Sequence, residues 1–136
     1  MALKPVSKLK KELDKYFSLY IRLRNATNEG VAQCFTCGKV GHYKKLQCGH
    51  FQSRKHHSTR WNEQNCQVQC VKCNMFGQGE QWKFGIQLDR QYSEGTSREL
   101  QEIARTTVKF MRIEIEENII YYKTLVRNLK KEKEIE

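Results

Sequence analysis

The segment between positions 31 and 74 decides the fold of this chain, and it reads VAQCFTCGKVGHYKKLQCGHFQSRKHHSTRWNEQNCQVQCVKCN. Two CxxC pairs bracket it, Cys34 with Cys37 and Cys70 with Cys73, and 32 residues separate the pairs. Each pair brings two thiolates to one point, and four thiolates complete a tetrahedral zinc shell. Because such a shell leaves no position for water or substrate, we predict a structural Zn²⁺ site.

The segment between the two pairs is long enough to contain further secondary structure, since simple zinc ribbons have only about 15 to 20 residues there. Residues 46–51 and 65–70 are predicted to be strands, the second because cysteine and valine alternate with glutamine. Cys48 and Cys66 lie on these strands and are expected to be packed thiols rather than ligands. His42 is an alternative ligand, although four thiolates at better spacing are already present.

Helical periodicity flanks this segment on both sides. Over residues 3–28, apolar side chains recur at steps of three and four with basic residues between them, which predicts an amphipathic helix with a basic outer face. A helix over residues 97–104, with an N-cap at residues 96–97, is predicted to lead into a long helix over residues 106–131. Residues 75–92 are expected to form a loop followed by a short helix or strand.

The charge of the chain is unevenly distributed along its 136 residues. Residues 1–60 hold 13 basic and 3 acidic side chains, whereas residues 61–136 hold 12 of each, so the net charge of +10 belongs to the first part. A basic surplus of this kind predicts a polyanionic partner, with nucleic acid as the first candidate.

Several classes of protein are excluded by composition. No run approaches 18 apolar residues, and the first residues lack the apolar stretch of a signal peptide, so we expect a soluble cytoplasmic protein with no membrane contact. Cysteines in such a reducing compartment are typically metal ligands or free thiols rather than disulfides. A single proline and eight glycines argue against a disordered Pro/Gly-rich chain.

A second polar pattern lies in and just after the bracketed segment, with His50, Asn65 and Asn74 in that order. This order resembles the HNH or ββα-metal nuclease motif, and CxxC followed by Asn is the form seen in endonuclease VII-type junction resolvases. The closer resemblance is to the phage NinG/Rap recombination endonucleases, and it covers roughly residues 5–95. Their motifs CxxCG, GH-aromatic, R-aromatic-NE-x-N and QCxxCN occur in this order at residues 34–38, 49–51, 60–65 and 69–74.

The resemblance implies an α+β fold in a single domain. It predicts a small zinc-clasped, treble-clef-like ββα-metal core over residues 31–92, preceded by the basic helix over 3–28 and followed by a helical arm over 97–131. The implied activity is metal-dependent hydrolysis of phosphodiester bonds in branched DNA, such as Holliday junctions, D-loops or flaps formed during phage recombination.

The resemblance also implies roles for individual residues. His50 would be the general base that deprotonates the attacking water, because an imidazole with a pKa near 6.5 suits this task at neutral pH. Asn74 would bind a catalytic Mg²⁺ or Mn²⁺ ion, and Asn65 would hold the loop and so orient His50.

One position departs from the motif. Many HNH enzymes have an aspartate immediately before the base histidine as a second metal ligand, and here Gly49 occupies that position. We expect Glu63, or a neighbour such as Asn62 or His57, to complete the metal site. A surface salt bridge is an equally weighted alternative for Glu63.

DNA contacts are predicted for basic residues of the segment and of the first helix. Arg54 and Arg60 are expected to clamp phosphates. Further contacts are expected from Lys55, His57, Lys8, Lys11 and Lys15. A two-fold junction fits a homodimer with two active sites, and other phage recombination proteins are possible partners.

The apolar stripe of the C-terminal helix needs burial against the N-terminal helix or another subunit. Two other functions compatible with the sequence are a non-catalytic, zinc-stabilised nucleic-acid-binding module and a protein-interaction zinc finger with a coiled-coil arm.

Overall fold

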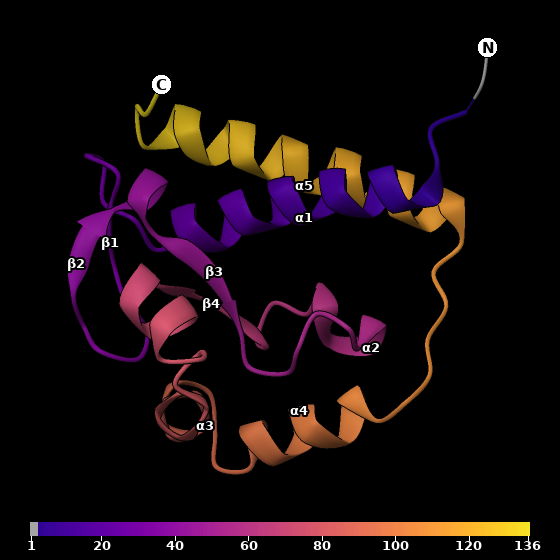
Figure 1. Ribbon diagram of the computed structural model, residues 1–136. Helices are drawn as coiled ribbons and strands as arrows, with labels where there is room; N and C mark the ends of the chain where they lie inside the picture. Colours follow the sequence, from indigo (N-terminus) through magenta and orange to yellow (C-terminus); the bar gives the residue numbers. More distant parts are fainter. Residues whose placement is uncertain (1–2) are drawn as a thin grey trace.

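Two long helices run side by side along one edge of the molecule (Figure 1). The computed structural model describes residues 3–136, with α1 over Val6–Leu23 and α5 over Arg112–Glu132. The two helices are parallel, because contacts join their beginnings and their ends. The guanidinium of Arg112 donates to the carbonyl of Lys4, and Lys133 Nζ donates to the carbonyl of Ala26.

The interface between α1 and α5 is the largest part of the core. Apolar residues at steps of three and four on each helix interlock there, and the ring centroids of Phe17 and Tyr122 lie 4.9 Å apart edge to face. The stripe of the C-terminal helix is therefore covered by α1 of the same chain and needs no second subunit for burial. The buried residues of the α1–α5 interface are Leu9, Leu13, Phe17 and Ile21 of α1, and Ile115, Ile119 and Tyr122 of α5.

Both terminal helices are shorter than predicted. The first ends at Leu23 rather than near residue 28, and the last begins at Arg112 rather than at Thr106. Residues 107–111 have no helical structure, which follows from the β-branched side chains at its start and from the distance this connection must span to return beside α1. The carboxylate of Glu114 then caps α5 by accepting the N–H of Met111.

The middle of the chain forms two antiparallel hairpins. The pair β3 (Gln47–His50) and β4 (Cys66–Gln69) confirms the two predicted strands. The pair β1 (Val31–Gln33) and β2 (Val40–His42) was not predicted, since strands of three residues carry too little alternation to be recognised. The chain is thus a mixed α+β protein, as expected.

Short helices pack around the hairpins. They are η1 (Tyr43–Lys45), α2 (His57–Arg60), the π-helical turn η2 (Lys72–Phe76), α3 (Gln81–Gln91) and α4 (Thr96–Ala104). The segment that was compatible with helix or strand is therefore helical. Among the described residues, no helix combines the length and apolar character needed to cross a membrane.

The start of α4 is capped differently from the prediction. Gly95, rather than Thr96 or Ser97, is the N-cap residue, and neither predicted side chain caps the helix. Instead, Asp89 of α3 accepts the backbone N–H of Ser97 at 2.8 Å. A carboxylate at a helix N-terminus pairs with unsatisfied N–H groups, so this contact also ties α3 to α4.

Candidate functional site

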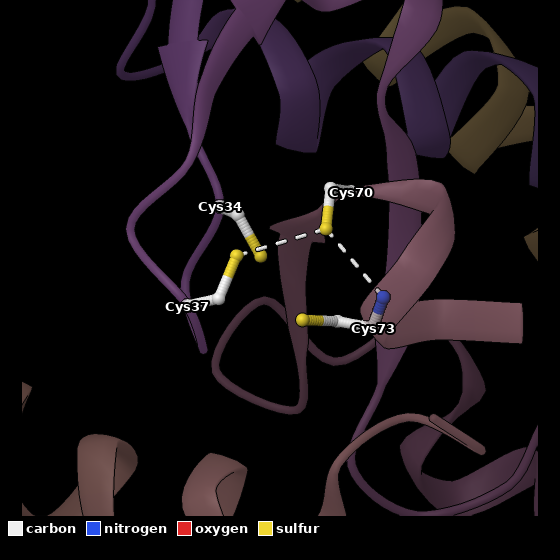
Figure 2. A group of neighbouring side chains, drawn as sticks. All are labelled: Cys34, Cys37, Cys70 and Cys73. Atoms are coloured by element: carbon white, nitrogen blue, oxygen red, sulfur yellow. Dashed lines mark hydrogen bonds between the residues drawn. The ribbon is translucent and has the colours of Figure 1, made fainter. Parts of the chain in front are cut away.

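Four cysteine side chains converge beside the second hairpin (Figure 2). Cys34 and Cys37 come from the turn after β1, Cys70 follows β4, and Cys73 lies in η2. The four sulfur atoms all lie within 4.8 Å of one another, and those of Cys37 and Cys70 are 3.7 Å apart. Zn–S bonds of about 2.3 Å in a tetrahedron place sulfur atoms about 3.8 Å apart. The cluster therefore fits a structural metal ion such as zinc, as the spacing predicted.

Backbone amides support this four-cysteine cluster. The N–H of Cys73 points to the sulfur of Cys70 at 3.5 Å, and the N–H of Lys39 points to that of Cys37 at 3.4 Å. His42, the alternative ligand, lies outside the cluster, and its Nδ1 accepts the backbone N–H two residues further along. The candidate metal site thus consists of thiolates alone.

A groove of about 980 Å³ lies between α1, β3 and the segment around η2. It brings together His50 and Asn74, two of the three residues predicted to act in catalysis. Arg54 and Asp14 also line it, and among the described residues that do so Asp14 alone is acidic. The groove is the place where the candidate chemistry of this chain converges.

His50 ends β3 and is held by the backbone of α2. Its Nε2 lies 3.0 Å from the carbonyl oxygen of Arg60. Because a carbonyl only accepts hydrogen bonds, this contact places the proton on Nε2 and leaves the lone pair on Nδ1. Burial lowers the pKa of His50, partly offset by the carbonyl of Arg60 and by Asp14. The imidazole is therefore neutral at pH 7, with Nδ1 able to accept a proton.

Asn65 is fully buried and closes the loop between β3 and α2. Its Nδ2 donates to the carbonyls of Gln52 and Thr59, at 3.1 and 3.0 Å, and its Oδ1 accepts the N–H of Gln52 at 2.7 Å. Thr59 directly precedes Arg60, whose carbonyl contacts His50. Asn65 thus holds the loop one residue away from the carbonyl that contacts the histidine.

Asn74 reaches the groove from η2, immediately after the last cysteine of the cluster. Its Nδ2 donates to Oε1 of Gln47 at 2.7 Å. This bond orients the carboxamide and leaves Oδ1 as the atom with which Asn74 can accept. An amide oxygen of this kind is a ligand that Mg²⁺ or Mn²⁺ accepts.

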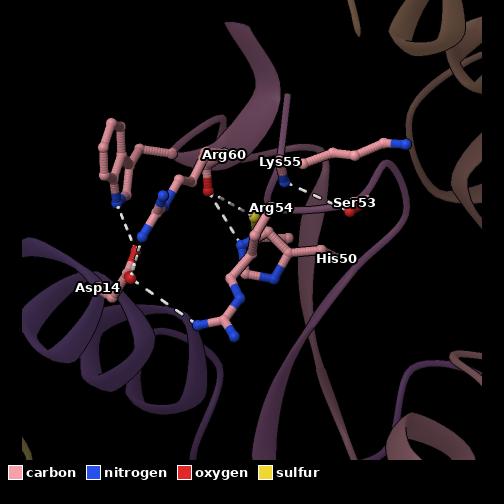
Figure 3. A network of polar contacts seen from close by, with 8 residues as sticks. Asp14, His50, Ser53, Arg54, Lys55 and Arg60 are labelled. Atoms are coloured by element: carbon pink, nitrogen blue, oxygen red, sulfur yellow. Dashed lines mark hydrogen bonds and ion pairs between the residues drawn. The ribbon is translucent and has the colours of Figure 1, made fainter. Parts of the chain in front are cut away.

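Asp14 on α1 is the centre of a polar network beside His50 (Figure 3). It pairs with Arg60 through both oxygens, at 3.1 Å to Nε and 2.6 Å to Nη2, and accepts Trp61 Nε1–H at 2.9 Å. The Arg60 side chain is only 16% exposed, so the prediction that it clamps phosphate is corrected to a structural ion pair. Nη1 of Arg54 lies 3.8 Å from Oδ2 of Asp14, but the Arg54 side chain is 65% exposed, which leaves it accessible to a phosphate.

Glu63 lies away from the groove. Its two carboxylate oxygens accept the hydroxyls of Tyr20 and Tyr122, at 3.2 and 2.9 Å, so it joins α1 to α5. Its neighbours are also engaged elsewhere, since Asn62 Oδ1 accepts two backbone N–H groups of its own turn and His57 lines a separate hollow. The structure therefore does not bring Glu63 or either neighbour to Asn74. Its partners are tyrosines, so the salt-bridge alternative for Glu63 is wrong as well.

The glycine before the base candidate has a packing explanation. A Cβ atom on Gly49 would lie 1.9 Å from Oε1 of Gln69. The Gln69 side chain is fully buried and its Nε2 donates to the hydroxyl of Thr36 and the carbonyl of Gly79, at 3.0 and 2.9 Å. Gln69 therefore occupies the space that the side chain of an aspartate at position 49 would need.

The remaining predicted DNA contacts lie outside the groove lining. Lys55 is exposed next to Arg54, and three lysines of α1 are exposed on its outer side. The α1 residue that brings positive charge to the groove is instead Arg22, whose guanidinium donates to the carbonyl of Tyr43. The three exposed lysines are Lys8, Lys11 and Lys15.

Sequence reasoning missed Asp14 and counted Arg22 only among the basic residues of the first helix, because both belong to a helix far from the motif along the chain. An acidic residue among the lysines of a basic helix was the available signal for Asp14. No periodicity distinguishes Arg22 from the other basic residues of that helix. Their positions at the groove follow only from the packing of α1 against β3.

A comparison with known protein families matches residues 1–133 to the family model described as Bacteriophage Lambda NinG protein. No curated protein and no solved structure matches the chain significantly. The matched range extends beyond residues 5–95 and includes the four-cysteine cluster, the groove and all of α5. The chain therefore belongs to the bacteriophage lambda NinG family.

Proposed function

We propose that this chain is a structure-selective DNA endonuclease that hydrolyses phosphodiester bonds in branched recombination intermediates, such as Holliday junctions, D-loops and flaps. The observation that carries the proposal is the setting of His50. This histidine lines a groove beside the four-cysteine cluster, its Nε2 faces a carbonyl, and Asn74 lines the same groove. A neutral imidazole and an amide oxygen in one groove suit metal-assisted phosphodiester hydrolysis.

In the proposed reaction, Nδ1 of His50 takes a proton from the water that attacks phosphorus. The bond between phosphorus and the leaving 3′ oxygen breaks as the bond to water forms. The carbonyl oxygen of Arg60, 3.0 Å from Nε2, accepts a hydrogen bond from Nε2–H and favours the imidazolium that develops. Asn65 supports this arrangement by fixing the preceding residue, Thr59. Asn65 is therefore a positioning residue.

Asn74 would bind the divalent ion of this reaction. The Oδ1 atom of Asn74 and the open groove suit Mg²⁺ or Mn²⁺, which keep several waters and bind substrate phosphate oxygens. Such an ion polarises the scissile phosphate and neutralises charge on the leaving oxygen. Asp14 is the acidic residue at this groove, but Arg60 and Trp61 already occupy its carboxylate, so we propose Asn74 as the principal protein ligand.

Positive charge supports DNA as the substrate. Arg54 is exposed at the groove, and Lys55 follows it in the same loop. The exposed lysines of α1 extend the basic surface beyond the groove. Contacts of this kind bind the phosphate backbone and position it without reading bases, which suits recognition of DNA shape.

The proposed homodimer rests on the symmetry of a junction, because the apolar stripe of α5 is already covered by α1. Light scattering at micromolar protein, with and without a four-way junction, tests it. A monomeric mass under both conditions would exclude the dimer.

Cleavage of matched DNA substrates tests the proposed activity. A four-way junction, a D-loop, a flap and a linear duplex are incubated with the protein in Mg²⁺, Mn²⁺ or EDTA. We expect metal-dependent cutting of the branched substrates by wild type and loss of cutting by His50→Ala, with DNA binding retained. Removal of a general base typically costs about 10² to 10⁴ in rate.

His42→Ala is the matched control, because His42 lies on β2 outside the groove lining. Cutting that survives His50→Ala, or that falls equally in both variants, would contradict the role of His50. Tight DNA binding without cutting in any metal would favour the non-catalytic nucleic-acid-binding module.

A further inference from the structure

We propose that Cys48, His50 and Cys66 form a second metal-binding site, selective for cations that prefer thiolate and imidazole ligands, such as Zn²⁺ or Co²⁺. It is distinct from the four-cysteine cluster, with which it shares no residue. The inference starts from the pairing of β3 with β4. Cys48 and His50 are two residues apart on β3 and so project from the same face, and Cys66 is the Cα partner of His50 on β4.

The side chains of these three residues converge in space. One ring nitrogen of His50 and the sulfur atoms of Cys48 and Cys66 all lie within 4.8 Å of one another. The carbonyl oxygen of Arg60 holds two of them, at 3.0 Å from Nε2 of His50 and 3.5 Å from the sulfur of Cys66. Small side-chain rotations would bring three donors to the spacing of a tetrahedral site.

The site has one ligand in the protein core and two ligands that an ion can reach from the groove. Cys66 is fully buried in the α1–α5 core, whereas Cys48 and His50 line the groove. Two thiolates and one imidazole leave the fourth tetrahedral position free, and two of these three ligands line the groove. The sulfur ligands disfavour Mg²⁺ and Mn²⁺, so the site would discriminate against the ion proposed for Asn74.

Occupation of this site would remove the base of the proposed reaction, a consequence that rests on the proposed function. A neutral imidazole has one nitrogen lone pair. Coordination through Nδ1 uses that lone pair directly, whereas coordination through Nε2 displaces its proton to Nδ1. In either case His50 cannot accept a proton from water, so a thiophilic ion inhibits cleavage.

Metal stoichiometry tests the site independently of nuclease activity. Full-length protein that carries one zinc ion is titrated with Co²⁺ under anaerobic, reducing conditions, and sulfur-to-cobalt charge-transfer absorption is recorded. We expect wild type to bind a further equivalent with this absorption, giving two metal ions per chain. Cys48→Ser and Cys66→Ala should each bind one ion only. His56→Ala is the matched control, since His56 lines the groove outside the cluster, and it should bind two.

Circular dichroism shows whether each variant is folded, and Cys48→Ser is the safer change because Cys48 is only half-buried. A single equivalent in wild type would overturn the proposal. So would a second equivalent that persists in folded Cys48→Ser.

Cleavage of a four-way junction in Mg²⁺ then tests the consequence. The ratio of rates without and with a second equivalent of Zn²⁺ should be large for wild type and close to one for Cys48→Ser. Absence of cleavage in all conditions would refute the proposed function but leave the stoichiometric result standing. Cleavage with no zinc effect, despite two bound ions, would refute the inhibitory role of the site.

Discussion

Asp14 holds Arg60 with both carboxylate oxygens, at 3.1 and 2.6 Å, across the interface between α1 and the β3–β4 hairpin. The same Arg60 offers its carbonyl to His50. The N-terminal helix therefore helps to position the candidate base, because Arg60 contacts both Asp14 of α1 and His50. This arrangement makes α1 a part of the candidate site as well as a part of the core.

We expect Asp14→Ala to destabilise the fold, because it removes the partner of the Arg60 guanidinium, and the Arg60 side chain is only 16% exposed in the wild-type structure. Loss of hydrogen bonds to a charged group of this kind costs about 2 kcal/mol. Denaturant unfolding measures the change. Glu12→Ala is the matched control on the same helix, since the Lys4–Glu12 pair has a 64% exposed lysine and should contribute little. Equal stability of the two variants would contradict the structural role of Asp14.

Glu63→Ala is expected to lower stability rather than to act on catalysis. The change leaves two tyrosine hydroxyls at the α1–α5 interface without their acceptor, at a cost of about 1 to 3 kcal/mol. A double-mutant cycle with Tyr122→Phe, followed by thermal or denaturant unfolding, separates the pairwise contribution. Additive effects of Glu63→Ala and Tyr122→Phe would show that the 2.9 Å contact contributes nothing.

Gly49→Ala should destabilise the hairpin because its Cβ would overlap the buried side chain of Gln69. Overpacking of this kind costs about 1 to 3 kcal/mol, and here Gln69 would also lose its hydrogen bonds to Thr36 and Gly79. We expect Gln69→Ala to relieve the overlap, so that the double variant is more stable than the sum of the single effects predicts. Simple additivity in urea unfolding would contradict this explanation.

The lowered pKa of His50 predicts a pH dependence of stability. In the unfolded chain the histidine titrates near pH 6.5, whereas in the folded protein it binds a proton only at lower pH. Below about pH 6.5 the unfolded state therefore binds more protons, and stability falls as pH falls through this window. Above it the contribution is constant.

Unfolding of wild type and His50→Gln at about pH 7.5 and about pH 5.5 measures this effect. The free energy of unfolding of wild type, relative to that of His50→Gln, should be lower at the lower pH than at the higher pH. Taking the difference removes the acid sensitivity that both share through the thiolates of the four-cysteine cluster. A pH-independent difference would mean that burial does not perturb His50.

The elements that the sequence alone predicted are those with local signals. The spacing of two CxxC pairs predicted one four-cysteine cluster, because each pair is a local turn that needs only one long-range contact to meet the other. Alternation predicted β3 and β4, and periodicity predicted α1 and α5 but placed their inner ends too far toward the middle of the chain. Family motifs identified His50, Asn65 and Asn74 as candidates.

What only the tertiary structure decided is how residues from different elements pair. Glu63 meets two tyrosines, Arg60 meets Asp14, and Gln69 fills the space beside Gly49. The tertiary structure also places Cys48 and Cys66 around His50, whereas sequence reasoning expected these two cysteines to be packed thiols. A motif specifies which residue types are present, but the partner of a charged or polar side chain depends on how α1 and the hairpin pack. That packing arises from dispersed apolar contacts, which leave no motif in the sequence.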